Sequence, residues 1–235
     1  MALLEKSLAS CTSTVVSGRA GAGKTSLALD FARNCGRDVA WYKVDAAEDE
    51  REIFFQYLIA SIRTQRLDFG TKTLMPAAKT AQLDQVPLVA EAFVYELLEC
   101  ESKPLLIVVE DLHLVFDSEW LVPFFQRLLP LLPSEVHMLI TSRSMPPAPL
   151  WRMRSKQTLS VIEEEALAFT RQEAIELFES YGLSSEHAKI AFDRAHGRAA
   201  TLTEVAATLN ESQKRIPADS YVQKRNKLSA EELRC

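Results

Sequence analysis

The feature that most constrains the fold is the stretch VVSGRAGAGKTSLALDF, residues 15–31. Gly18 is followed by four residues and then by Gly23, Lys24 and Thr25, which is the G-x-x-x-x-G-K-[ST] spacing of a phosphate-binding loop. Such a loop lies between an apolar strand and a helix, because backbone N–H groups and the helix N-terminus bind the anion together. The pattern therefore predicts a strand–loop–helix unit near the start of the chain.

Seven residues of this loop are the candidate nucleotide ligands: Gly18, Gly21, Ala22, Gly23, Lys24, Thr25 and Ser26. The glycines allow successive N–H groups to point at one anion, while Lys24 is expected to reach the β- and γ-phosphates and the Thr25 hydroxyl to ligate Mg²⁺. The rival pattern is the dinucleotide fingerprint G-x-G-x-x-G, but Ser26 occupies the position of its third glycine. The loop therefore predicts a site for a nucleoside triphosphate such as ATP.

A second part of the site is predicted where the apolar run LLIVV ends in Glu110 and Asp111. A phosphate-binding loop needs a carboxylate on a neighbouring strand to hold Mg²⁺. We expect Glu110 to serve Mg²⁺ and Asp111 to orient or deprotonate the attacking water; the alternative is two acids placed in solvent. The run VHMLITSR ends in Arg143, which is expected to contact the γ-phosphate or an adjacent domain, or else only closes a strand at the surface.

The alternation of elements predicts an α/β fold. Apolar, β-rich runs predict strands at residues 13–17, 39–45, 104–111, 136–143 and 158–162, and periodic patterns predict helices at 25–34, 49–66, 82–100 and 119–132, with 67–81 irregular. Strands that alternate with helices form a parallel sheet with right-handed crossovers. We therefore expect a five-stranded parallel P-loop sheet flanked by helices.

After residue 162 only helical patterns remain. Thr170 and Glu173 form a capping-box pattern before a helix that Gly182 closes, and residues 185–195 and 201–209 continue the helical series. We expect a P-loop core at 1–162, a small helical lid at 163–212 and a polar, disordered tail at 213–235.

Composition narrows the class of protein. A formal net charge of −5 argues against a protein that coats nucleic acid, and no apolar run is long enough for a membrane span. No signal peptide is expected, and the four cysteines are too far apart for a C-x-x-C zinc site or a disulfide framework. Reduced thiols and a cytoplasmic location are therefore expected.

Several segments together resemble one family. In chain order they are SGRAGAGKTSLALDFA, VAWYKVDAAEDE, LLIVVEDLHLV, LITSRSMPPAPLWRMRSKQ, FTRQEAIELF and AHGRAATLTEVA. Over residues 10–210 they look like the ATPase domain of STAND signalling proteins, of the type found in MalT and the large LuxR-type transcription regulators. The resemblance implies an AAA+-like core with a helical lid that binds ATP or ADP, hydrolyses slowly and acts as a conformational switch. It places Lys24 and Thr25 in the Walker A motif, Glu110 and Asp111 in Walker B, and Arg143 as the sensor.

The sequence departs from this family at two positions and in its extent. Glu110 stands where Asp is common, and Arg198 stands where Trp is usual. The winged helix, the helical-repeat arm and the DNA-binding helix-turn-helix of the family are not found here. The chain is therefore expected to be either an excised domain or a stand-alone protein.

The main functional hypothesis is a signalling switch of a transcription regulator, with nucleotide as ligand and with further domains or partner proteins. Direct nucleic-acid binding by this segment and membrane association are not expected, and an oligomer on activation is compatible with this hypothesis. One alternative is an AAA+ motor with fast turnover, which needs a trans-acting arginine and a hexamer interface. The other is a P-loop kinase, which needs an acceptor pocket and a catalytic base.

Overall fold

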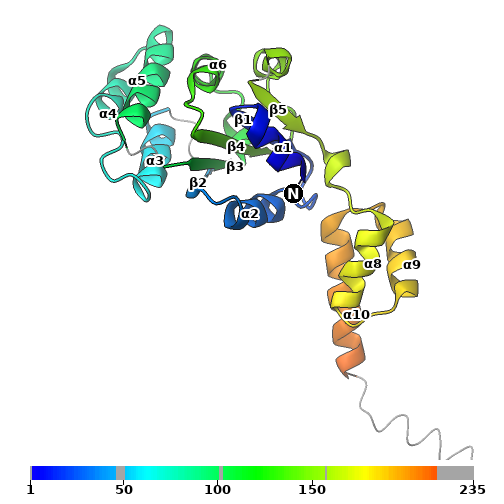
Figure 1. The fold of residues 1–235 in the computed structure, drawn as a ribbon. Coiled ribbons are helices and arrows are strands. Elements are labelled where there is room, and N and C mark those ends of the chain that lie inside the picture. Colours follow the sequence, from blue (N-terminus) through cyan, green and yellow to red (C-terminus); the bar gives the residue numbers. More distant parts are fainter. Residues whose placement is uncertain (1, 46–50, 101–102, 157, 216–235) are drawn as a thin grey trace, which may run out of the picture. The chain divides into compact units, whose positions relative to one another are not determined.

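The computed structural model describes residues 2–45, 51–100, 103–156 and 158–215 (Figure 1). It divides the chain into two compact units, residues 1–167 and residues 168–235. The first unit is an α/β structure and the second is helical. None of the described helices is both long and apolar enough to cross a membrane.

The strands and helices of the first unit alternate along the chain. They are α1 (Ala2–Ser10), β1 (Ser13–Ser17), α2 (Lys24–Asn34), β2 (Asp38–Lys43), α3 (Arg51–Arg63), α4 (Leu74–Thr80), η1 (Leu83–Gln85), α5 (Val86–Glu99), β3 (Leu105–Glu110), η2 (Leu112–Val115), α6 (Leu121–Leu131), β4 (Val136–Ser142), α7 (Ala148–Trp151), η3 (Arg152–Lys156), β5 (Leu159–Ile162) and η4 (Glu164–Leu167).

All five strands pair in parallel, in the order β2-β3-β4-β1-β5. This confirms the predicted fold class, a parallel P-loop sheet flanked by helices. Strand β4 lies between β1 and β3, so that the loop after β1 and the acids after β3 are separated by one strand. The carboxyl ends of β1, β3 and β4 therefore meet at one edge of the sheet, where ligands of parallel α/β sheets bind.

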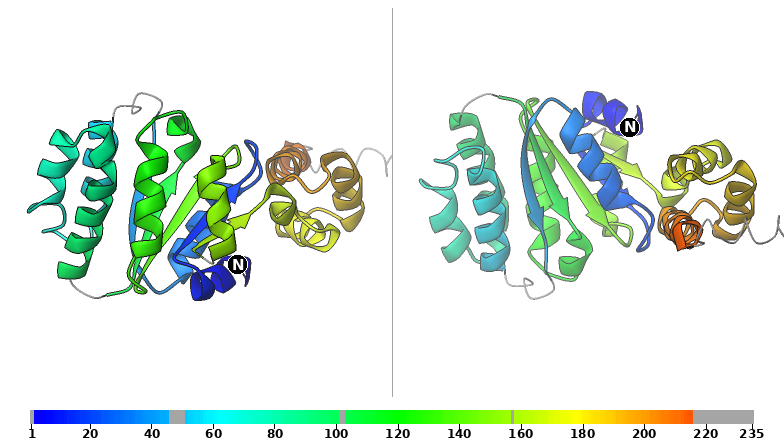
Figure 2. Two further views of the ribbon diagram at one scale, coloured as in Figure 1. Left: turned by 90° about the horizontal axis from the view of Figure 1, so that it is seen from above. Right: turned by 90° about the horizontal axis from the view of Figure 1, so that it is seen from below.

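Two apolar cores cover the two faces of the sheet. Along β3, Ile107 and Val109 belong to a core with α3, α5 and α6, whereas Leu106 and Val108 belong to a core with α1 and α2. This alternation follows from the two-residue period of a strand. Figure 2 shows the same division, with α1 and α2 on one side of the sheet and α5 and α6 on the other.

The structure adds two helices that the sequence did not predict. Residues 67–81 were expected to be irregular, but they contain α4 (Leu74–Thr80). An N-terminal helix was not expected, but α1 runs from Ala2 to Ser10 and buries Leu4. The helix predicted over 119–132 is confirmed as α6, which contains Pro130 in its last turn. A proline is tolerated in that last turn because the helix has no further turns to disrupt.

The second unit contains α8 (Arg171–Ser180), α9 (Ser185–Ala195) and α10 (Ala199–Arg215), packed around Phe178, Leu183 and Leu202. The capping box of Thr170 with Glu173 is confirmed, as is the helix over 185–195. The lid role of these helices stays a prediction. Two further expectations, the helix start at Asp49 and the tail beyond residue 215, lie outside the described residues.

Candidate functional site

The loop between β1 and α2 has the geometry of an anion-binding turn. Its first residue, Gly18, donates its N–H to the Ser142 carbonyl at 3.1 Å, which ties the loop to the end of β4. Gly21 and Gly23 have φ of 81° and 91°, a conformation that side chains with a Cβ rarely adopt. Ala22 is buried between them, and its N–H donates to the Arg19 carbonyl at 3.2 Å. The glycines therefore occupy positions where the turn requires them.

Lys24 begins α2 and is buried, with 7% of its surface exposed. Its Nζ donates to the carbonyls of Gly18 at 2.5 Å and Arg19 at 3.0 Å. Burial lowers the pKa of the Lys24 ammonium, while the nearby Asp111 carboxylate opposes that shift. The ammonium is thus held inside the loop at the start of α2, where the positive end of the helix dipole also favours an anion.

The carboxylate of Glu110 connects the loop to the sheet. The Thr25 hydroxyl donates to Glu110 Oε1 at 2.6 Å, and the indole N–H of Trp41 donates to Glu110 Oε2 at 3.2 Å. Glu110 is 7% exposed and is the last residue of β3. The two predicted metal ligands, Thr25 and Glu110, are therefore in direct contact.

This pair fits a magnesium ion that is completed by phosphate oxygens. Mg²⁺ takes one or two protein oxygens and otherwise keeps waters and substrate phosphates. Within the described residues, no cluster of three or more His, Cys, Asp or Glu side chains is arranged to hold a metal. Thr25 and Glu110 would thus hold Mg²⁺ only together with a nucleotide, and the ion would screen the phosphate charge there.

Asp111 lies next to Glu110 in a left-handed backbone conformation, with φ of 59°. Its N–H donates to the Thr141 hydroxyl at 3.1 Å, so the turn is fastened to β4. Its Oδ1 lies 3.9 Å from Arg143 Nε and 3.8 Å from His113 Nδ1. The structure therefore brings Asp111 and Arg143 together at the strand ends, with Arg143 still largely exposed.

His113 belongs to the same cluster. Its Nδ1 is buried and has no hydrogen-bond partner among the described residues. Burial lowers the pKa of this imidazole, and the carboxylate of Asp111 opposes the shift. The imidazole thus lies beside the Asp111 carboxylate, and its lowered pKa favours the neutral form.

The remaining loop residues and arginines have less direct roles. Ser26 is exposed in the first turn of α2. Arg154 lies over the Trp151 ring at 4.3 Å and 3.5 Å from Glu163, so its contacts are those of a surface residue.

Two contacts could not be found from the sequence. Trp41 donates to Glu110 from the neighbouring strand β2, a contact that no motif in the sequence indicates. Glu164 accepts the Arg19 main-chain N–H at 2.8 Å and the Arg19 Nε at 3.1 Å, which fastens the loop to η4. A local signal for either is absent, because the partners are 69 and 145 residues apart.

Comparison with known proteins agrees with this geometry. Residues 1–141 match the family model described as AAA ATPase domain. The chain is similar to the HTH-type transcriptional regulator MalT of Serratia proteamaculans (strain 568), with 28% identity over 204 residues. That similarity covers 85% of this chain and 22% of the regulator, so the chain spans about a fifth of its relative's length. The resemblance found in the sequence is confirmed.

Solved structures with a similar fold include a Walker-type ATPase of Pyrococcus abyssi, with a TM-score of 0.51 and 13% identity, covering 97% of this chain and 74% of that chain. Another is the Drosophila ORC bound to DNA, with a TM-score of 0.52 and 16% identity, covering 87% of this chain and 56% of that chain. At these identities the likeness shows the fold alone.

Proposed function

The chain belongs to the family of AAA ATPase domains, and from this premise we propose that it is a switch module that binds ATP or ADP with Mg²⁺ and hydrolyses ATP slowly. The observation that carries the proposal is the 2.6 Å contact between Thr25 and Glu110, which joins the phosphate-binding loop to the carboxylate strand. The same two oxygens are those that a nucleotide-bound Mg²⁺ requires.

Each residue of the site has a part in this proposal. Lys24 neutralises the phosphates, and the loop N–H groups orient them. Asp111 orients the attacking water, while Arg143 approaches the γ-phosphate. Loss of that phosphate removes the common partner of these groups, which is how nucleotide-operated switches change state.

Slow turnover is favoured over a motor by the surroundings of Asp111. Its carboxylate has Arg143 and His113 as neighbours at 3.9 and 3.8 Å, and its backbone is fixed by Thr141. In the proposed switch, Arg143 exchanges this ion pair for the γ-phosphate before Asp111 acts on a water. The similarity to MalT supports a role inside a larger transcription regulator, with DNA bound by other segments and with the cytoplasm as location.

The first test is nucleotide binding by the full chain. The protein is heat-denatured and any released nucleotide is identified by chromatography, and ATP and ADP affinities are measured by calorimetry after nucleotide removal. Lys24→Ala should abolish tight binding, whereas Lys79→Ala, at an exposed lysine on α4, should not. Unchanged affinity in the Lys24 variant would contradict the assignment of the loop.

A turnover assay then separates the alternatives. Motors hydrolyse at about 1 s⁻¹ or faster, whereas unassisted P-loop switches are slower by orders of magnitude. A phosphorylated acceptor among the products would instead indicate a kinase.

A further inference from the structure

Trp41 contacts the site through its indole N–H, 3.2 Å from Glu110 Oε2. Trp41 lies on β2, where it pairs in register with Val108 of β3, and Glu110 is two residues further along β3. Because side chains alternate along a strand, Val108 and Glu110 lie on the same face. That face is the one covered by α1 and α2, and the Trp41 ring packs against its core.

The arrangement leaves each carboxylate oxygen of Glu110 with one donor. Oε1 receives the Thr25 hydroxyl at 2.6 Å, and Oε2 receives the Trp41 indole. A glutamate has one more rotatable bond than an aspartate, so its carboxylate loses more conformational freedom when it is fixed at one point. The indole N–H belongs to a rigid ring that is partly buried against an apolar core, which restricts the positions of this donor.

We propose that Trp41 is a positioning residue, which fixes Glu110 through its indole N–H so that the other carboxylate oxygen faces Thr25 and the Mg²⁺ of a bound nucleotide. This inference rests on the proposed function. In this structure the one carboxylate of Glu110 contacts both donors. Trp41 therefore acts on the metal only through Glu110.

The expected consequence is confined to Mg²⁺-dependent binding. Without Trp41, Glu110 can rotate away from Thr25, and the metal loses a preorganised ligand. The hydrogen bond joins a charged acceptor to a neutral donor, so its removal should weaken Mg·ATP binding by about 10-fold. Binding of metal-free ATP depends on the loop and on Lys24, and it should not change.

The experiment compares three proteins: the wild type, Trp41→Phe and the control Trp151→Phe. Phenylalanine keeps an aromatic ring and removes the donor, and Trp151 lies on α7, outside the site. ATP affinity of the full chain is measured by calorimetry with saturating Mg²⁺ and again with EDTA. Only Trp41→Phe should lose affinity, and only with Mg²⁺.

Each other outcome overturns an identifiable claim. If Trp41→Phe loses equal ATP affinity with Mg²⁺ and with EDTA, Trp41 only supports the fold. If it loses no affinity, the hydrogen bond from Trp41 to Glu110 does not contribute to Mg·ATP binding. Either result refutes this inference and leaves the proposed function standing. ATP affinity of the wild type that does not depend on Mg²⁺ would refute it as well. If the wild type binds no nucleotide, the proposed function fails, and this inference fails with it.

A measurement without nucleotide tests the contact itself. In protein labelled with ¹⁵N-tryptophan, the Trp41 indole resonance is identified by its loss in Trp41→Phe. Glu110→Ala should shift that resonance and speed its exchange with water, while the Trp151 resonance stays in place. An unmoved Trp41 resonance would refute the hydrogen bond even if Trp41→Phe proves unstable.

A double substitution tests the route of the effect. Aspartate at position 110 is one methylene shorter, and we expect its carboxylate to lose the bond to the Trp41 indole. In a Glu110→Asp background, Trp41→Phe should therefore cause no further loss of Mg·ATP affinity. A further loss of about 10-fold would show that Trp41 acts by another route and would refute the proposal.

Discussion

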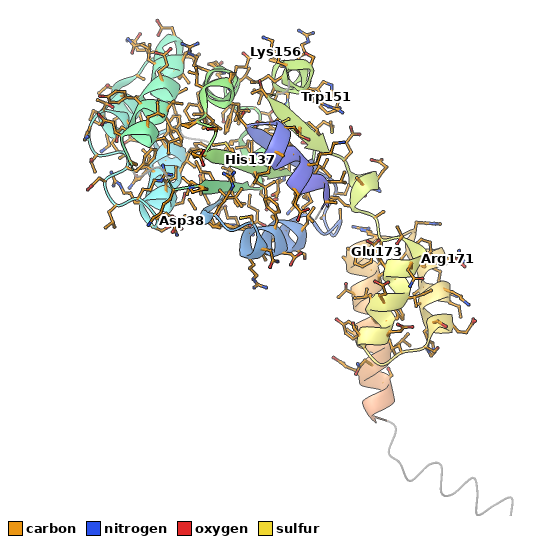
Figure 3. All side chains as sticks on the ribbon, viewed as in Figure 1. Asp38, His137, Trp151, Lys156, Arg171 and Glu173 are labelled. Carbon is orange, nitrogen blue, oxygen red and sulfur yellow. The ribbon has the colours of Figure 1, made fainter. Side chains whose placement is uncertain are left out.

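Acidification should destabilise the first unit through His137, a buried histidine on β4 that is labelled in Figure 3. Its Nδ1 lies 3.1 Å from the Cys11 carbonyl, and its Nε2 lies 2.9 Å from the Thr14 hydroxyl. The Thr14 hydroxyl is in turn 2.5 Å from that of Ser7 on α1. These bonds connect the N-terminal helix to two central strands.

The direction of each bond follows from the chemistry of its groups. A carbonyl can only accept, so Nδ1 carries the proton and Nε2 is the acceptor of the Thr14 hydroxyl. Thr14 then accepts from Ser7. A second proton on Nε2 would turn Thr14 from donor to acceptor at that bond, and its own hydrogen would have to find another partner. The neutral imidazole is therefore the form that satisfies the whole chain of bonds.

The size of the destabilisation follows from the pKa of His137. Burial, followed by the nearby charge of Arg37, lowers the pKa of His137 to about 4, whereas an unperturbed histidine has a pKa of about 6.5. At a pH above the pKa of the unfolded state, neither the folded nor the unfolded protein protonates His137, and His137 makes its full contribution to the free energy of unfolding. As the pH falls from about 6.5 to about 4, only the unfolded state is protonated, so ~3 kcal/mol of unfolding free energy is lost.

The assay is urea unfolding at a series of pH values between about 7.5 and 4.5, with wild type and His137→Gln compared. Carboxylates also contribute to the slope, for example Glu173, whose pKa is lowered by hydrogen bonds from Thr170. The difference between the two proteins isolates His137. The glutamine variant should be less stable at neutral pH but should lose less stability on acidification.

A matched control separates the hydrogen bond from the titration. Thr14→Val removes the bond to Nε2 and retains the imidazole, so it should lower stability at neutral pH and keep a histidine-dependent slope. If wild type and His137→Gln show the same pH dependence, His137 does not titrate between the two states and the reasoning is refuted.

Two further predictions concern the site and the second unit. Asp111→Asn should keep ATP binding and slow hydrolysis by at least about 10-fold, as expected for the loss of a water-orienting carboxylate; undiminished turnover in a steady-state assay would exclude that role. Gly197→Ala should destabilise the helices of the second unit by more than ~2 kcal/mol, since its φ is +78° and a Cβ would lie 2.5 Å from the Phe169 carbonyl oxygen. Gly182→Ala, with φ of +73° and open space around the Cβ, should cost only ~1 kcal/mol. Hydrogen exchange of the second unit measures both, and equal effects would contradict the steric argument.

The sequence was sufficient where the signal was local. The buried strand β3 is apolar from Leu105 to Val109, and the phosphate-binding loop has its glycines, lysine and threonine within eight residues. The acids after β3 could be assigned because the strand order of a parallel sheet brings its carboxyl ends together.

The sequence was insufficient where a distant residue supplies the missing interaction. Helix α4 is short, contains Pro76 and was expected to be irregular. Its start is stabilised by Glu96 of α5, which accepts the N–H groups of Thr73 and Leu74 at 2.7 Å. A carboxylate that caps a helix from another element replaces the local N-cap signal, so no pattern within residues 67–81 could reveal it. The role of Trp41 could not be predicted for the same reason, because its partner Glu110 is 69 residues away in the sequence.

Hydrogen bonds between neighbouring strand ends also connect the residues of the site to one another. The end of β3 is bonded to β2, because Val44 donates its N–H to the Glu110 carbonyl at 2.9 Å. The turn at Asp111 is bonded to β4 through Thr141, and the loop after β1 is bonded to β4 through the Ser142 carbonyl. In the proposed switch, a group that moved toward a phosphate at one strand end would therefore change the bonds of its neighbours. These bonds are made by the strand ends that carry Thr141, Glu110 and Asp111. A change of nucleotide would therefore alter hydrogen bonds of β2, β3 and β4 as well as those of the loop. The proposed switch requires such an effect beyond the nucleotide site.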